Sequence, residues 1–583
     1  MRDFRRYVAL VFLLSTTFLG CAAATEEKQP RAVDLLLVNG HIYTSNPRQP
    51  WARALAIQGS RIVAVGDEKQ LAALRGPATR VIDLGGRMAM PGIIDSHSHF
   101  LDGSISLDQV SLDDVYTIPE MQKRVRAYAA AHPERAWLLG RGWVYDAFKP
   151  SGLPTKEILD EVVPDRPMVL ECYDGHSVWP NSRALALAGI DKNTPDPQHA
   201  GIVVGAVVHD PATGEPTGVL KEEAVDLVRR VIPKPGREEK LRALRAGLRE
   251  ANRHGLTSAL NASGSLEEME LYDELRRQGE LTVRMTTSLM MEPQLDAKTL
   301  AMYEEGRRRF QDEWVRGGVI KAFMDGVIES HTAAMIEPYS DDPKLSGSLN
   351  YTPEQFRSNV AELDRRNFQV ITHAIGGRAV RVTLDVYEAA AQANGPRDRR
   401  FRIEHIENIN PQDIPRFGRM GVIASMQPFH CYPEPNLLNV WARNVGPERL
   451  PYSFAWQAIA AGGAMLAFGS DWPVVSLDPF IGIQNAVTRQ DWNGQPAEGF
   501  VSAQRVTLDA ALAAYTCDAA YAEFEETRKG TLDRGKLADL IVLSQDLFAV
   551  KPLEIRKTVP VLTMVGGQIV YEDSSAKLSA RGR

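Results

Sequence analysis

The sequence is poor in cysteine, and its four cysteines lie far apart. Cys172, Cys431 and Cys517 are odd in number and show no paired C-x-x-C spacing, while Cys21 lies in the N-terminal segment. A disulfide framework and a zinc finger both need closely paired cysteines, so this pattern argues against both. We interpret the three later cysteines as core or incidental thiols.

The chain also lacks a long basic stripe and an acidic tail. Its 67 basic and 74 acidic residues are interspersed and give a formal charge of −7. Nucleic acid is therefore not an expected partner, because nucleic-acid binding normally requires a clustered basic face. The 583 residues, 44% apolar and 24% charged, suit a globular protein large enough for more than one domain.

The N-terminal apolar run, Tyr7 to Leu19, is too short for a comfortable transmembrane helix. It follows three arginines, so we expect residues 1–24 to be a signal peptide. Phe18-Leu19-Gly20-Cys21 resembles a bacterial lipobox with Phe at the position of the usual Leu. The expected location is the periplasm or cell envelope of a bacterium, with membrane contact only through a lipid anchor at Cys21. Ordinary cleavage near Ala22–Ala24 is the alternative.

Both ends of the remaining chain have sequence patterns typical of short β-strands. Short β-rich runs separated by turns extend from Asp34 to Met90, including the hairpin signal Asn39-Gly40, and similar runs return from Leu540 to Tyr571. Neither end has enough strands to bury a core alone. We therefore expect residues 31–90 and 526–575 to pair into one composite β-sandwich.

The middle segment, residues 91–525, alternates apolar runs with amphipathic helical stretches, as an α/β barrel does. The clearest predicted strands are 318–324, 368–373, 401–405, 422–426 and 464–471. The region of about 101–231 is rich in Pro and Gly and mixes both patterns. We interpret it as an insertion that covers the mouth of the barrel.

Four histidines come at the ends of these apolar runs and predict a metal site: His97, His99, His373 and His405. His97 and His99 are two residues apart, so on a strand both imidazoles point to one face. A zinc-class ion prefers imidazole and carboxylate ligands, and a hydrolytic site keeps one position open for water. Any one of these histidines alone would be better read as a hydrogen-bonded core or loop residue.

Asp471 follows another apolar run and completes the predicted ligand set. A bare carboxylate is costly there unless it meets a metal or a donor. Beside a metal it can accept a proton from attacking water and pass it to the leaving group, which makes it the predicted catalytic residue. A helix N-cap or turn aspartate is the alternative. Lys321 lies on an apolar strand, points into the barrel and is the sixth residue of the predicted metal site; an ordinary salt bridge is the alternative role.

These motifs together resemble the YtcJ-like subgroup of the amidohydrolase superfamily, which includes N-substituted formamide deformylase. The resemblance covers nearly all of 33–571. It is carried by the run from Met90 to His99, the Lys321 strand, His373, Arg402-Ile403-Glu404-His405 and Gly469-Ser470-Asp471-Trp472-Pro473. It implies a (β/α)8 TIM-like barrel with a composite β-sandwich and one or two divalent metals, most often zinc. It also implies that Lys321 is carboxylated by CO2 to a carbamate that bridges two ions.

The chain departs from the subgroup at Gly377, where an Asp is usual, and this removes a local carboxylate but no metal ligand. Trp143 and His176 lie in the covering insertion and are candidate substrate-binding residues, with packing and turn roles as their alternatives.

The leading hypothesis is a metal-dependent hydrolase of small-molecule carbon–nitrogen bonds other than peptide bonds: an amide, an N-substituted formamide or a cyclic amide. An esterase, lactonase or isomerase on the same site, and a non-catalytic small-molecule-binding lipoprotein, are the alternatives. The sequence does not specify the oligomeric state, and a homodimer is one possible assembly.

Overall fold

The computed structural model describes residues 32–199, 202–576 and 578–581. The expected signal peptide and Cys21 lie outside these residues, so export and lipid anchoring stay predictions, as does the homodimer. Among the residues described, no helix is long and apolar enough to cross a membrane.

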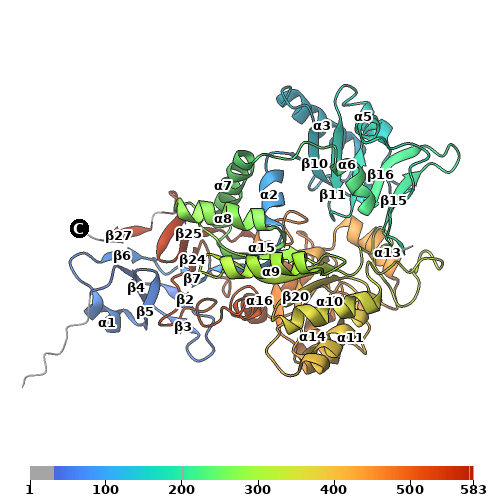
Figure 1. Cartoon of the computed structure of the whole chain (residues 1–583). Helices are drawn as coiled ribbons and strands as arrows, with labels where there is room; N and C mark the ends of the chain where they lie inside the picture. The colour runs from blue at the N-terminus through green and yellow to red at the C-terminus, as the bar shows by residue number, and fades with distance from the viewer. Residues whose placement is uncertain (1–31, 200–201, 577, 582–583) are drawn as a thin grey trace, which may run out of the picture.

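At the centre of the molecule is an eight-stranded parallel sheet that curls into a nearly closed barrel (Figure 1). In spatial order its strands are β8 (Ile93–Ser98), β17 (Leu256–Gly264), β18 (Arg284–Met290), β19 (Val315–Phe323), β20 (Gln369–Ala374), β21 (Arg402–His405), β22 (Ile423–Met426) and β23 (Leu466–Phe468). The last strand is joined to the first mainly through the segment that follows β23. There the Asp471 N–H donates to the His97 carbonyl at 2.7 Å, and the His99 N–H donates to the Trp472 carbonyl at 2.6 Å.

Amphipathic helices surround this barrel. The longer of these helices include α7 (Arg237–Arg253), α8 (Leu266–Arg277), α9 (Ala297–Arg309), α10 (Pro353–Arg365), α11 (Gly377–Asn394) and α15 (Pro479–Thr488). In α7 the buried residues Leu241, Leu244, Leu248 and Ala251 recur at helical spacing, while charged residues occupy the other face. Ser265 begins α8 by accepting a hydrogen bond from the Glu268 N–H at 3.2 Å.

The two ends of the chain form a β-sandwich beside the barrel, at the left of Figure 1. One sheet has the order β27 (Ser579–Arg581), β6 (Arg80–Asp83), β1 (Leu35–Val38), β4 (Ala54–Gln58) and β5 (Arg61–Gly66). The other has the order β26 (Gln568–Glu572), β25 (Pro560–Val565), β24 (Leu540–Leu543), β7 (Met88–Pro91), β2 (His41–Tyr43) and β3 (Trp51–Ala52). Each sheet therefore combines N- and C-terminal strands. For example, β7 (Met88–Pro91) pairs antiparallel with β24 (Leu540–Leu543). The predicted fold class, a barrel with a composite sandwich, is therefore confirmed.

Another sheet, of mixed parallel and antiparallel strands, is inserted between α2 (Phe100–Ser106) and α7, at the upper right of Figure 1. Its order is β15 (Gly205–His209), β16 (Pro216–Glu222), β12 (Ser177–Pro180), β11 (Met168–Cys172), β10 (Leu138–Trp143) and β9 (Val110–Ser111). It packs its own apolar clusters, separate from the core of the barrel. The inserted sheet thus folds around its own interior and meets the barrel at the rim.

Candidate active site

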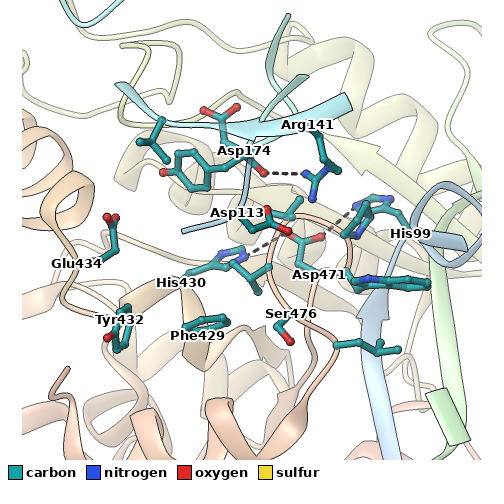
Figure 2. A pocket seen from close by; sticks show the side chains of 18 of the residues that line it. His99, Asp113, Arg141, Asp174, Phe429, His430, Tyr432, Glu434, Asp471 and Ser476 are labelled. Atoms are coloured by element: carbon teal, nitrogen blue, oxygen red, sulfur yellow. Dashed lines mark hydrogen bonds and ion pairs between the residues drawn. The ribbon is translucent and has the colours of Figure 1, made fainter. Parts of the chain in front are cut away.

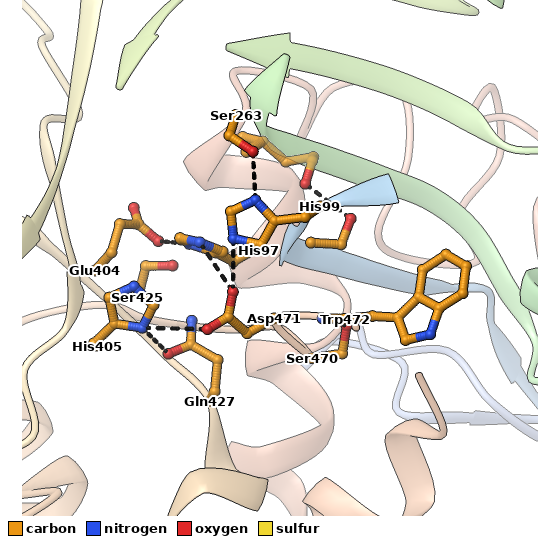
Figure 3. Close-up of polar contacts among 12 residues, drawn as sticks. His97, His99, Ser263, Glu404, His405, Ser425, Gln427, Ser470, Asp471 and Trp472 are labelled. Atoms are coloured by element: carbon orange, nitrogen blue, oxygen red, sulfur yellow. Dashed lines mark hydrogen bonds and ion pairs between the residues drawn. The ribbon is translucent and has the colours of Figure 1, made fainter. Parts of the chain in front are cut away.

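The carboxyl ends of the barrel strands bring His97, His99, His405 and Asp471 together (Figure 3). His97, His405 and Asp471 offer ligand atoms that all lie within 4.8 Å of one another. Oδ1 of Asp471 lies 3.0 Å from Nε2 of His99 and 3.5 Å from Nε2 of His97. His405 (φ 73°) and Asp471 (φ 63°) both adopt left-handed backbone conformations, which are costly for these residues and concentrate at functional sites.

The other ring nitrogen of each of these histidines has its own partner. Nδ1 lies 2.5 Å from Oε2 of Glu404 in His97, 2.5 Å from Oγ of Ser263 in His99, and 2.8 Å from Oε1 of Gln427 in His405. When Nδ1–H donates to these oxygens, each Nε2 carries a lone pair, which is the tautomer a metal ligand needs.

This arrangement leaves acceptors facing acceptors. Nε2 lone pairs of His97 and His99 meet Oδ1 of Asp471, which is buried and has no aligned hydrogen-bond donor. Two acceptors at such distances repel each other unless a proton or cation lies between them. The imidazole and carboxylate donor set is the one zinc prefers, so these residues fit a divalent metal ion.

The charge states of these groups also suit a cation. Burial holds the pKa values of His373 and His405 well below the ordinary value, so both rings are neutral at pH 7. Burial alone would raise the pKa of Asp471, but His97, His99 and His405 outweigh it and leave that pKa well below its usual value. The site therefore presents an ionised carboxylate beside the neutral rings of His373 and His405.

Lys321 is fully buried, and its Nζ lies 3.2 Å from Nε2 of His97. Burial lowers the pKa of Lys321 to about 8, against the opposing charges of Glu404 and Asp471.

His373 lies slightly apart from the other ligands. Its Nε2 donates to the Gly326 carbonyl at 3.1 Å, which leaves Nδ1 with the lone pair, and its ring centroid is 4.6 Å from that of His405.

Several residues that support the site were not assigned a role from the sequence. Glu404 accepts hydrogen bonds from Arg402 at 2.9 and 3.0 Å as well as from His97. Asp95 accepts from the N–H groups of His97 (3.1 Å) and Ser470 (2.9 Å), and from the Ser470 hydroxyl (2.5 Å). The available signal was a charged residue one to three positions before a predicted ligand: Asp95 before His97, and Arg402 and Glu404 before His405.

A cavity of about 670 Å³ opens beside these residues (Figure 2). Its wall includes Asp471, His430 and, from the inserted sheet, Arg141 and His176. Nδ1 of His176 lies 2.8 Å from Oε2 of Glu222. Burial opposes protonation of this ring, but the Glu222 carboxylate outweighs it and raises the His176 pKa to about 9. His176 thus presents a cation to the cavity at neutral pH.

The structure does not bring Trp143 to this cavity, so its proposed substrate-binding role is corrected. Trp143 is fully buried in the core of the inserted sheet, and its Nε1 donates to the Leu170 carbonyl at 3.0 Å. A register shift between Arg141 and Trp143, at Gly142 with φ 98°, breaks the strand alternation. Arg141 therefore faces the cavity while Trp143 turns into the core. Gly377 borders a different cavity, beside Asn408 and Arg449.

Comparisons with known proteins agree with this site. The model of the amidohydrolase family matches residues 80–571. The chain is 34% identical to protein LONG AFTER FAR-RED 3 of Arabidopsis thaliana, over 92% of this chain and 91% of the relative. It is 30% identical to putative amidohydrolase YtcJ of Bacillus subtilis (92% and 99% covered) and 25% identical to N-substituted formamide deformylase of Arthrobacter pascens (92% and 98%).

Among solved structures, an uncharacterized metal-dependent hydrolase from Pyrococcus horikoshii matches with a TM-score of 0.70 and 25% identity, over 89% of this chain and 99% of that one. The resemblance to YtcJ-like proteins is confirmed. The chain belongs to the amidohydrolase family and is a metal-dependent hydrolase.

Proposed function

We propose that the protein hydrolyses a carbon–nitrogen bond of a small molecule, in an amide, an N-substituted formamide or a cyclic amide. The observation that carries this proposal is the compact group of His97, His405 and Asp471 beside a cavity large enough for such a molecule. Its relative N-substituted formamide deformylase supports the type of bond.

These residues would hold a divalent metal, which when bound would polarise a carbonyl group and lower the pKa of water to about 7. Asp471 is ionised, so it accepts the proton of the attacking water and later donates that proton to the leaving nitrogen. Glu404, Ser263 and Gln427 hold the three imidazoles in the tautomer and orientation that metal binding requires.

We further propose that the metal is zinc and that Lys321 is carboxylated by CO2, in which case its carbamate would supply oxygen ligands to one or two ions. The carboxylation needs a neutral amine, and a buried Lys321 beside His97 suits it. His97, His99, His373, His405 and Asp471 would hold the metal together with the carboxylated Lys321.

Removal of metal tests the function directly. We expect the protein treated with a chelator to lose hydrolysis of small amides and to regain it with zinc. Asp471→Asn that retains metal should lower kcat by about 100- to 10,000-fold, because the proton acceptor is lost. The compounds tested as substrates should include N-substituted formamides, N-acyl amino acids, cyclic imides, lactones and aryl esters.

Asp478→Asn is the matched control, because Asp478 begins α15 by accepting from the Phe480 N–H and asparagine caps a helix equally well. Activity that survives complete metal removal would refute the proposal. Undiminished turnover in Asp471→Asn would remove Asp471 from its role, and turnover of only the lactones or esters would change the bond that is cleaved.

A further inference from the structure

Arg141, on β10 of the inserted sheet, lies on the wall of the cavity as a buried cation. It is only 5% exposed. Its Nη2 donates to the Tyr173 carbonyl at 3.0 Å, and its Nε has no hydrogen-bond partner. In the part of the chain that the structure describes, Arg141 forms no ion pair with a carboxylate of the protein.

The backbone around Arg141 is fixed by its two glycine neighbours. A Cβ on Gly140 would lie 2.6 Å from the Val110 carbonyl oxygen, and one on Gly142 would lie 2.7 Å from Oδ1 of Asp113. β10 is therefore pressed against the segment that contains β9, and a larger neighbour on either side would displace it. Figure 2 shows the Arg141 side chain reaching from this strand into the cavity.

Three carboxylates on the same wall, those of Asp174, Glu407 and Glu434, differ from Arg141 because donors of the protein hold them. Asp174 accepts from the Tyr145 hydroxyl at 2.8 Å and from the His176 N–H at 2.9 Å. Glu407 accepts from Nε1 of Trp441 at 2.6 Å. Glu434 accepts from the N–H groups of Asn436 and Leu437, each at 2.8 Å. These acids have donors within the protein, whereas the guanidinium of Arg141 has the Tyr173 carbonyl as its partner and, among the residues described, no carboxylate.

A buried guanidinium stays charged, and leaving it without a counter-ion is costly. Its planar fork of donors matches the two oxygens of a carboxylate. We propose that Arg141 binds a carboxylate of the substrate, so that the amide cleaved is an acidic one, such as an N-acyl amino acid. The identity of the bond cleaved rests on the proposed function, whereas the carboxylate contact rests on Arg141 alone.

The test compares two amides that differ only in a carboxylate, N-acetylphenylalanine and N-acetylphenethylamine, with the zinc-loaded protein. Aromatic side chains on the wall, including Phe429 and Tyr432, suit their common ring. Arg141→Gln should lower kcat/KM for N-acetylphenylalanine by about 10- to 150-fold, mainly through KM. The neutral amide should change by less than about threefold, and Arg141→Lys should recover part of the loss.

Arg556→Gln is the matched control, because Arg556 also borders the cavity but stacks on the Trp492 ring at 4.7 Å from the centroid. Equal losses on both amides in Arg141→Gln would overturn the proposal and reduce Arg141 to a structural role. A loss in Arg556→Gln instead, or a wild-type preference for the neutral amide or for an amide that carries an ammonium group, would also overturn it.

Failure of the proposed function is recognised separately, as no hydrolysis of either amide. Calorimetric titration of both compounds into the zinc-loaded wild type and Arg141→Gln then decides. Binding that depends on the carboxylate and is lost in Arg141→Gln supports the proposal, and equal binding of the two amides overturns it.

Discussion

The cavity has two sides that are built differently. On the barrel side, each ligand histidine is held at one ring nitrogen by the protein, as His97 is by Glu404 and His405 by Gln427. On the side of the inserted sheet, the Arg141 guanidinium donates one hydrogen bond, to the Tyr173 carbonyl, and its Nε has no hydrogen-bond partner. Groups that perform chemistry are held rigidly by the protein, whereas a group that binds the substrate keeps unpaired donors for it.

The two sides also depend on different cores. Parallel strands place their carboxyl ends at one rim, so the barrel brings residues from distant parts of the chain to one point. The inserted sheet has an apolar interior of its own. Recognition can therefore change in the inserted sheet without moving the metal ligands.

The largest effect should come from Lys321 on the barrel side. Lys321→Ala should lose metal and lower kcat by about a thousandfold, because the metal supplies several kcal/mol of transition-state stabilisation. Metal per chain and kcat measure this. If Lys321 is carboxylated, the wild type should hold close to two ions, and short carboxylic acids with zinc should restore part of the activity. A variant with full metal content and activity would leave Lys321 as a structural cation.

A substitution in the core of the inserted sheet should lower the stability of the protein without affecting metal binding. Trp143→Ala should lower the free energy of unfolding by about 3–5 kcal/mol, because it leaves a large cavity. Its zinc content should stay unchanged, since its cluster lies outside the barrel strands. Urea unfolding and metal analysis measure the two quantities, with the barrel-side Trp456→Ala as the comparison. Loss of zinc in Trp143→Ala would show that the two sides are not separable.

A smaller effect, on metal affinity, should test whether the ligand histidines of the barrel side are held rigidly by their neighbours. Glu404→Gln should weaken zinc binding by about 10- to 100-fold, because the neutral amide holds His97 less firmly and leaves Arg402 without a charged partner. Competition with a chelator measures the affinity. Ser425→Ala is a suitable control, since Ser425 also contacts Arg402 but not His97. Unchanged affinity in Glu404→Gln would refute the claim that this contact orients His97.

The sequence predicts the barrel side well, because strand alternation directly places His97 and His99 on one face and Lys321 in the barrel. It also contained a signal for Glu404, a charged residue directly before the predicted ligand His405 and two residues after Arg402. The inserted sheet was less predictable. Regular alternation would put Arg141 and Trp143 on one face, but the irregularity at Gly142 separates them. A glycine in a strand marks such a point without telling which neighbour turns inward.

Asp95 has a consequence for how the protein becomes active. Its carboxylate binds the backbone of His97 on the first barrel strand and of Ser470 after the last. These residues are separated by most of the chain, and contacts so distant in sequence form late and slowly during folding. The same step that closes the barrel sets Asp471 against His97. A chain arrested before closure is therefore inert, and the appearance of hydrolysis during refolding reports completion of the barrel.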